Sequence, residues 1–483
     1  MQSARSGSWF ARWRPEIVLV ALVLVVAGPI VQILMAHQAS RLAFTSAVWD
    51  RATVQIDAYE AILSVDYAER AGHLYSDKAP GQPFLAAPFY GLARAVGAEP
   101  GEVDRPFDNY TLWWTSLWSA TIPAAALAVM MRRFALRVTR DPRAATAAAA
   151  TVALGTLLLP FATVLFSHVL AAALGFGAYL AARDPDAPPL RLAAAGLLGG
   201  LAVVTEYTTG IVVVVVGVLV LVRHRGGVLA YVAGGLPAVA VLAVYNAVAW
   251  GSPTEFSYDN SGSFGEFHAQ GLFGISPPDP QLTAQVLFGE RGLLTLTPIV
   301  LVGVFGLVRL ASERRTREVG VVGLVVLAAF TAIQGGWFSV TAGASPGPRY
   351  VVPAIPFVAV GVARAWRWSR ATVVIAGVLG AIPMLMAIAT NPLAQPTETF
   401  TAGHWAWRML EGRWGDTLLT PYLPAPWAHL VQLGVALALL AALCWVTVRQ
   451  LPRAVTAPAT LPAEDDDGAA VDVRVDAGEP DRR

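Results

Sequence analysis

Lysine, cysteine and charge are scarce in this chain of 483 residues. Lys78 is the single lysine, and the rest of the 34 basic residues are arginines. Cys444 is the single cysteine, which excludes an intrachain disulfide and a cysteine-based metal site. Charged residues make up 14% of the chain, whereas soluble proteins average about 25%. Together with 55% hydrophobic residues and a net charge of +1, this predicts a membrane protein that does not bind nucleic acid.

Long apolar runs recur along most of the sequence, and a run of about 18 residues or more is long enough to cross a bilayer. We therefore expect an all-α, polytopic membrane protein with about twelve spans. The arginines before the first run are typical of a signal peptide, but the run from Ile17 to Met35 is too long for one and no small-residue cleavage site follows. It is interpreted as a retained helix. The predicted spans are 16–36, 110–131, 144–162, 164–182, 190–206, 208–223, 227–249, 291–310, 318–335, 350–366, 371–389 and 426–448.

The arginines of the short connections indicate an orientation. If the N-terminus is cytoplasmic, each of the seven inner segments is rich in arginine, as in "MRRFALRVTRDPR" and "RLASERRTREVG", whereas the outer connections are poorer in it. The pattern predicts a multi-pass protein of the plasma membrane with both termini in the cytoplasm. Its parts would be a cytoplasmic N-terminus (1–15), a transmembrane domain (16–448) and a disordered acidic cytoplasmic tail (449–483).

Four predicted outer loops are long, whereas most inner loops are short. Long ordered loops carry function more often than short ones, so we expect the active site on the outer face of the membrane. The outer loops cover 37–109, 250–290, 336–349 and 390–425.

The first outer loop combines carboxylates with the lone lysine. Asp50, Asp57 and Asp66 precede the stretch Tyr75-Ser76-Asp77-Lys78. Residues 40–51 are predicted to be helical, and the apolar residues 84–96 are too few to span easily, which favours an interfacial helix. A site for a lipid-linked phosphate needs a compact cation such as lysine and a carboxylate that accepts a proton from an attacking hydroxyl.

Further candidates lie near the outer ends of predicted spans. Arg291 and Arg349 are arginines on the side where arginine is scarce, and with Lys78 they would form a cationic pocket for a phosphate. Glu206 is a carboxylate within apolar sequence and is a functional candidate for that reason. The remaining candidates for substrate binding are Tyr75, Asp77, His168 and Tyr245. The sequence has no P-loop and no HExxH motif.

The acidic first loop, the stretch "YSDKAPG" at 75–81 and the late "GPRY" resemble the polytopic GT-C glycosyltransferases. The nearest members are bacterial proteins similar to protein O-mannosyltransferases and lipid A aminoarabinose transferases. Ala79 stands where their Lys-Pro-Pro element has its first proline, and the loop lacks their adjacent acidic pair.

The resemblance implies a GT-C-like fold with a helical first outer loop and inverting transfer of a sugar from a polyprenyl-phosphate donor. The acceptor would be a lipid, a glycan or a protein. Asp57 is the first choice for the base, with Asp50 and Asp66 as alternatives, and Lys78 and Arg349 would contact the donor phosphate. Whether a divalent metal ion takes part stays open, since some families of this fold use one and others do not.

Two other classes of protein fit a twelve-span chain. A transporter or flippase of a lipid-linked or small solute usually places charges near the midplane and shows internal repeats. Here the charges gather at the outer ends of the spans, and the two halves show no repeat. A non-catalytic membrane scaffold is the third alternative.

Overall fold

The computed structural model describes residues 7–97, 109–263, 265–271, 274–395, 397–398 and 401–449, with side chains from Arg14 onward. Contacts divide the chain into residues 1–450 and residues 451–483, and the second unit lies outside the described residues. The predicted disorder of the tail after residue 449 and the end of the first predicted outer loop, 98–108, therefore fall outside the description as well.

The described residues are mostly helical, with two small two-stranded sheets. The α-helices, and the π-helical turn η3, are α1 (Gly7–Ala27), α2 (Ala36–Arg51), α3 (Gly81–Ala95), α4 (Tyr110–Ser116), η3 (Leu117–Thr121), α5 (Ile122–Thr139), α6 (Pro142–Leu154), α7 (Leu158–Phe161), α8 (His168–Ala182), α9 (Pro189–Thr205), α10 (Gly210–Arg223), α11 (Val228–Trp250), α12 (Gly265–His268), α13 (Pro280–Phe288), α14 (Leu293–Leu296), α15 (Ile299–Ser312), α16 (Arg317–Gly335), α17 (Ile355–Ala365), α18 (Arg370–Ala389), α19 (Thr401–Leu410) and α20 (Ala425–Arg449). Short 3-10 turns are η1 (Asp57–Ile62), η4 (Tyr207–Thr209), η5 (Arg225–Gly227), η6 (Ser257–Asn260) and η7 (Arg349–Ala354). Antiparallel strand pairs are β1 (Ile30–Val31) with β4 (Asp416–Thr417), and β2 (Ala68–Arg70) with β3 (His73–Tyr75).

Each of the twelve predicted spans overlaps a helix, so the all-helical expectation is confirmed. Within the described residues, five helices are long and apolar enough to cross a membrane. A sixth is added if Pro280–Leu296 and Ile299–Ser312, which are bent by 95°, count as one broken span. The predicted number of twelve spans is not confirmed.

Glycines allow the central helices to pack backbone against backbone. A Cβ atom at Gly306 of α15 would lie 1.8 Å from the carbonyl oxygen of Gly361 of α17. A Cβ atom at Gly361 would in turn lie 2.1 Å from the carbonyl oxygen of Gly303. Small residues at helix contacts are typical of membrane bundles, where close van der Waals packing holds helices together.

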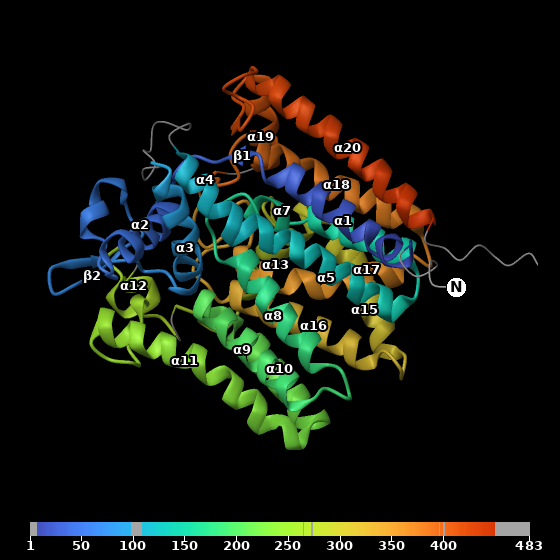
Figure 1. Ribbon diagram of the computed structural model, residues 1–483, viewed down its shortest axis with the longest axis horizontal. Helices are drawn as coiled ribbons and strands as arrows, with labels where there is room; N and C mark the ends of the chain where they lie inside the picture. Colours follow the sequence, from blue (N-terminus) through green and yellow to red (C-terminus); the bar gives the residue numbers. More distant parts are fainter. Residues whose placement is uncertain are drawn as a thin grey trace, which may run out of the picture. The chain divides into compact units, whose positions relative to one another are not determined.

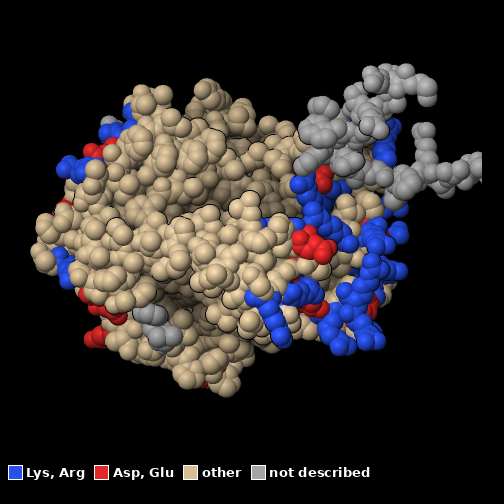
Figure 2. All heavy atoms as spheres, turned by 60° about the horizontal axis from the view of Figure 1, so that its bottom comes forward, with Lys and Arg blue, Asp and Glu red and all other residues tan. Residues whose placement is uncertain are grey.

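Arginine-rich connections gather at one end of the molecule, and a broad band almost free of charge separates them from the other end (Figure 2). Glu318 pairs with Arg183 at 3.6 Å and with Arg223 at 3.7 Å, and Glu313 pairs with Arg364 at 2.6 Å. These ion pairs join four of the seven predicted inner segments. The start of α1 and the end of α20 lie at this same end (Figure 1).

The first predicted outer loop forms a folded unit at the opposite end, built from α2, η1, the β2–β3 hairpin and α3 (Figure 1). Both helices expected in this loop are present, as α2 and α3. The hairpin was not expected, and its turn uses Ala71 and Gly72 with positive φ angles of 51° and 78°. It brings Asp66, just before β2, close to Lys78, just after β3.

Candidate active site

A cavity of about 820 Å³ opens where the four long predicted outer loops meet. Its volume lies within the range of about 300–1,000 Å³ that is usual for ligand sites. Each of the four loops contributes to its lining, for example through Lys78, Tyr258, Arg349 and Gln395. The separate loop segments therefore build one site.

Lys78 lies in this cavity's wall between two carboxylates. Its Nζ is 2.8 Å from Asp66 Oδ1 and 2.9 Å from Asp77 Oδ2, and the residue is 8% exposed. The backbone around it is fixed, because Ser257 donates a hydrogen bond to the Asp77 carbonyl at 3.0 Å and Ser76 lies 2.8 Å from Ser40 of α2. Burial acts to lower the pKa of Lys78, but the charges of Asp66 and Asp77 outweigh it and raise the pKa, so the side chain is an ammonium.

Arg349 is the first residue of η7 and lines the same cavity. It is 9% exposed and makes no ion pair with any described carboxylate, and its Nε has no hydrogen-bond partner. Its guanidinium carbon lies 5.9 Å from the centre of the Phe166 ring and 5.5 Å from that of Tyr350. Burial acts to lower the pKa of Arg349, but Tyr350 and the charges of Asp66 and Glu206 outweigh it and raise the pKa, so the side chain is charged. An anionic ligand would supply the direct ion pair that Arg349 lacks among the described residues.

A third polar group on the wall links α2 to α8 and to the end of α9. Arg41 donates to Ser167 at 2.9 Å, and Ser167 donates to Glu206 at 2.8 Å. His168 Nδ1 lies 3.3 Å from Glu206 Oε2. His168 and Glu206, both predicted to bind substrate, therefore line the cavity together.

Arg41 and His37 were not among the predicted site residues. Arg41 Nε donates to His37 Nε2 at 3.1 Å, and both residues line the cavity. Burial, followed by the charges of Lys78 and Arg349, lowers the pKa of His37 well below 6.5, so the imidazole is neutral at pH 7. The predicted helix began at residue 40 and so left out His37, whereas α2 begins at Ala36 and the spacing of four residues places His37 and Arg41 on one face of it.

Aromatic residues form another part of the wall, and these too were not predicted. The rings of Tyr258 and His268 stack at 4.3 Å, His268 meets Trp337 at 5.6 Å, and Trp337 meets Tyr350 at 5.0 Å. Rings of this kind offer a large, rigid apolar surface with a polar edge. They suit a ligand that has apolar faces as well as hydroxyl groups.

Two of the three predicted bases do not line the cavity. Asp57 is 41% exposed, accepts a hydrogen bond from the Leu74 amide at 2.9 Å and pairs with His73 at 3.4 Å. Asp50 accepts hydrogen bonds from the hydroxyls of Tyr59 at 2.9 Å and Tyr90 at 2.7 Å. Asp66 is the one that lies in the cavity wall.

Tyr75 and Tyr245 belong to a buried aromatic cluster beside the cavity. Tyr75 meets Trp250 at 5.0 Å, and Tyr245 meets Phe44 at 5.5 Å. Asp77 lies behind Lys78, 1% exposed and not in the cavity lining. These three predicted substrate-binding residues therefore support the site from outside its walls.

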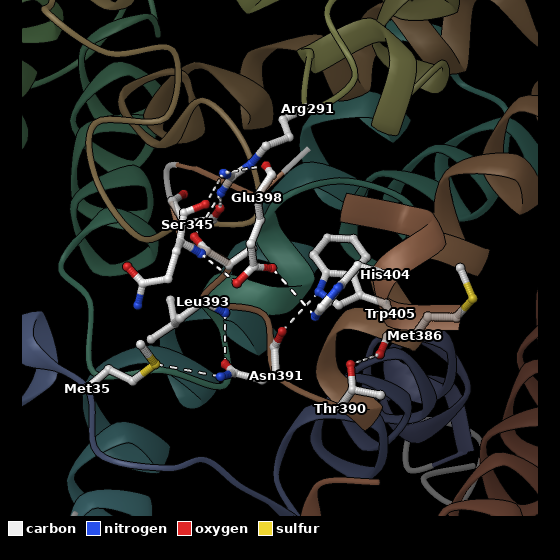
Figure 3. Close-up of polar contacts among 12 residues, drawn as sticks. Met35, Arg291, Ser345, Met386, Thr390, Asn391, Leu393, Glu398, His404 and Trp405 are labelled. Carbon is white, nitrogen blue, oxygen red and sulfur yellow. Dashed lines mark hydrogen bonds and ion pairs between the residues drawn. The ribbon is translucent and has the colours of Figure 1, made fainter. Parts of the chain in front are cut away.

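Arg291 holds three loops together through backbone carbonyl groups (Figure 3). Its guanidinium donates to the carbonyls of Ser345, Ala394 at 2.9 Å, Gln395 at 2.7 Å and Glu398 at 3.5 Å. Both terminal nitrogens of Arg291 thus already donate to backbone carbonyls, and the residue lies outside the cavity lining, so in this conformation it is not placed to bind a phosphate there.

No group of three or more His, Cys, Asp or Glu side chains that could hold a metal ion occurs in the described part of the chain.

Comparisons with known proteins gave similarity in structure alone. No family model and no curated protein matches the chain. The structure is similar to ArnT from Cupriavidus metallidurans bound to undecaprenyl phosphate, with a TM-score of 0.50 and 15% identity over 92% of this chain and 78% of ArnT. This likeness confirms the GT-C-like fold expected from the sequence.

Weaker similarity extends to two larger GT-C proteins. One is the archaeal oligosaccharyltransferase AglB from Archaeoglobus fulgidus, with a TM-score of 0.45 and 12% identity over 92% of this chain and 56% of AglB. The other is the arabinosyltransferase EmbB from Mycobacterium smegmatis, with a TM-score of 0.42 and 15% identity over 91% of this chain and 42% of EmbB.

Proposed function

We propose that the protein is a membrane glycosyltransferase that transfers a sugar from a polyprenyl-phosphate donor to an acceptor hydroxyl. The observation that carries the proposal is Arg349, a buried cation that makes no ion pair with a carboxylate of the described residues and lines the same cavity as the Lys78–Asp66 ion pair. A phosphate would supply the missing negative charge, and Asp66 is a carboxylate within the same cavity that can accept a proton. The GT-C-like fold and the undecaprenyl phosphate bound to ArnT support this choice of donor.

In the proposed reaction, the acceptor oxygen attacks the anomeric carbon of the sugar while Asp66 takes the hydroxyl proton. The bond between the anomeric carbon and the phosphate oxygen breaks, and its electron pair stays on the phosphate. Attack from the side opposite the leaving group inverts the anomeric configuration. Arg349 and Lys78 stabilise the charge that develops on the leaving phosphate, which is the kind of electrostatic contribution that is often the largest in an enzyme.

The orientation proposed for the membrane follows the positive-inside rule. The arginine-rich end, with the start of α1 and the end of α20, would face the cytoplasm, so the cavity at the other end would open on the outer face. The aromatic wall of Tyr258, Trp337 and Tyr350 would contact the sugar or the first isoprene units.

The test is a strain that lacks the gene, complemented with variants. Envelope glycans and glycolipids of the deletion strain are compared with those of the parent, and purified protein is assayed with polyprenyl-phosphate sugars. We expect one glycan modification to be lost, and to be restored by the wild type but not by Asp66→Asn. If Asp57→Asn is inactive and Asp66→Asn is active, the base is Asp57. If no glycan changes and lipid-linked solute transport is lost instead, the protein is a flippase.

A further inference from the structure

One ammonium in the cavity wall serves two carboxylates. Lys78 Nζ lies at hydrogen-bond distance from both Asp66 and Asp77, so this three-residue group carries one positive and two negative charges when both acids are ionised. Arg349, in contrast, has no carboxylate partner in the described structure. Lys78 and Arg349 therefore differ: Arg349 is available to an anion, whereas Lys78 is already neutralised.

We propose that Lys78 is a switched counter-ion, neutralised by Asp66 before transfer and released to the leaving phosphate when Asp66 takes up the acceptor proton. This inference rests on the proposed function. It assigns different tasks to the two cations: Arg349 binds the donor phosphate in the ground state, and Lys78 contributes most after the proton has moved. Stabilisation that appears only as the reaction proceeds raises the rate, whereas equal binding of both states does not.

The charges balance through the step. Before transfer there are a neutral acceptor hydroxyl, a singly charged phosphodiester and the Asp66 carboxylate. After transfer there are a neutral glycoside, neutral Asp66 and a polyprenyl phosphate with two negative charges. One negative charge has thus moved from Asp66 to the phosphate, and Lys78 lies beside the residue that loses it.

Asp77 keeps Lys78 charged and in place during this exchange. Its carboxylate is 1% exposed and absent from the cavity lining, so it is not placed to take the proton of an acceptor. Its backbone carbonyl is held by Ser257 of η6. Asp77 is therefore a positioning residue, which retains one ion pair to Lys78 when Asp66 is neutral.

The proposal makes an unusual prediction for Asp66→Asn, which mimics the protonated base. This variant should lose transfer and yet bind the product, polyprenyl phosphate, about tenfold more tightly, because one negative charge near the phosphate is removed and Lys78 is freed. The probes are undecaprenyl phosphate and, as the uncharged comparison, undecaprenol, measured on purified protein by native mass spectrometry. Asp186→Asn removes an equal charge from an exposed loop at the arginine-rich end and should change neither binding nor transfer.

A second pair of variants separates release of Lys78 from simple loss of repulsion. The Lys78→Met/Asp77→Asn background removes the ammonium without leaving Asp77 as a buried unpaired carboxylate. In this background Asp66→Asn should tighten phosphate binding much less than in the wild type. An equal gain in phosphate affinity in both backgrounds, or no gain in the wild-type background, overturns this inference but leaves the proposed function standing. If the wild type binds undecaprenyl phosphate no better than undecaprenol, the proposed function fails with it.

Discussion

Replacing Arg349 with methionine should separate binding from stability. Methionine keeps much of the side-chain length and contacts with the Phe166 and Tyr350 rings, but removes the charge. Because no described carboxylate pairs with Arg349, its removal leaves no buried counter-charge behind. The folded protein should therefore lose little stability, because burial opposes the charge of Arg349 while Tyr350 and the charges of Asp66 and Glu206 favour it, and no ion pair is broken.

The effect on phosphate binding should be large. A hydrogen bond to a charged group contributes about 1.5–3 kcal/mol, and each 1.4 kcal/mol corresponds to a factor of about ten in affinity. The loss of Arg349 should therefore weaken binding of undecaprenyl phosphate by about 10- to 100-fold. Binding of undecaprenol should change little, because the alcohol has no charge for Arg349 to recognise.

The assay combines native mass spectrometry with thermal unfolding in the same detergent. The expected result is a drop in affinity for the phosphate with a melting temperature that changes little. Unchanged phosphate affinity would refute the reasoning. So would a melting temperature that falls as far as that of Arg291→Met, which removes an arginine with a structural role.

Three further perturbations have defined outcomes. Arg291→Met should lower the free energy of unfolding by about 3 kcal/mol or more, because several buried carbonyl groups lose their hydrogen-bond donor. Thermal unfolding checks this prediction, and an unchanged melting temperature would contradict it. Gly361→Ala should prevent stable folding or lower the melting temperature strongly, since its Cβ would lie 2.1 Å from the Gly303 carbonyl oxygen, and a variant as stable as the wild type would disprove this packing. His37 has a pKa lowered by burial and then by neighbouring cations, so the unfolded state binds more protons once the pH falls below 6.5 and stability should decrease there. His37→Gln should show less of this loss when melting is compared at about pH 5.5 and about pH 7.5, and an identical loss would assign it to other groups.

Much of the helical architecture could be predicted because apolar composition and helix formation coincide in a membrane protein. Each predicted span overlaps a helix, and the two helices expected in the first loop are present. Whether an apolar helix crosses the bilayer depends also on its length and bend, and the 95° break before Ile299 is not visible in hydropathy.

The site was predictable in residue type but not in geometry. Lys78 was predicted because lysine is scarce in the chain, and Arg349 and Arg291 were predicted because both are arginines at the outer end of a helix. The structure gives these two arginines different surroundings. The partners of Arg291 lie about 50 to 100 residues further along the chain, so no local pattern distinguishes it from Arg349.

The choice among Asp50, Asp57 and Asp66 depended on an unexpected local fold. The β2–β3 hairpin brings Asp66 beside Lys78, whereas Asp57 contacts the hairpin's second strand through the Leu74 amide and the His73 side chain. Three-residue strands give too short an alternation to be recognised in a sequence.

The most direct test of the account is a structure of the protein bound to undecaprenyl phosphate, determined by electron cryomicroscopy in a lipid nanodisc. We expect the phosphate in the cavity, within ion-pair distance of the Arg349 guanidinium and next to the Lys78 ammonium. A phosphate bound outside this cavity, with Arg349 still lacking an anionic partner, would contradict the central claim.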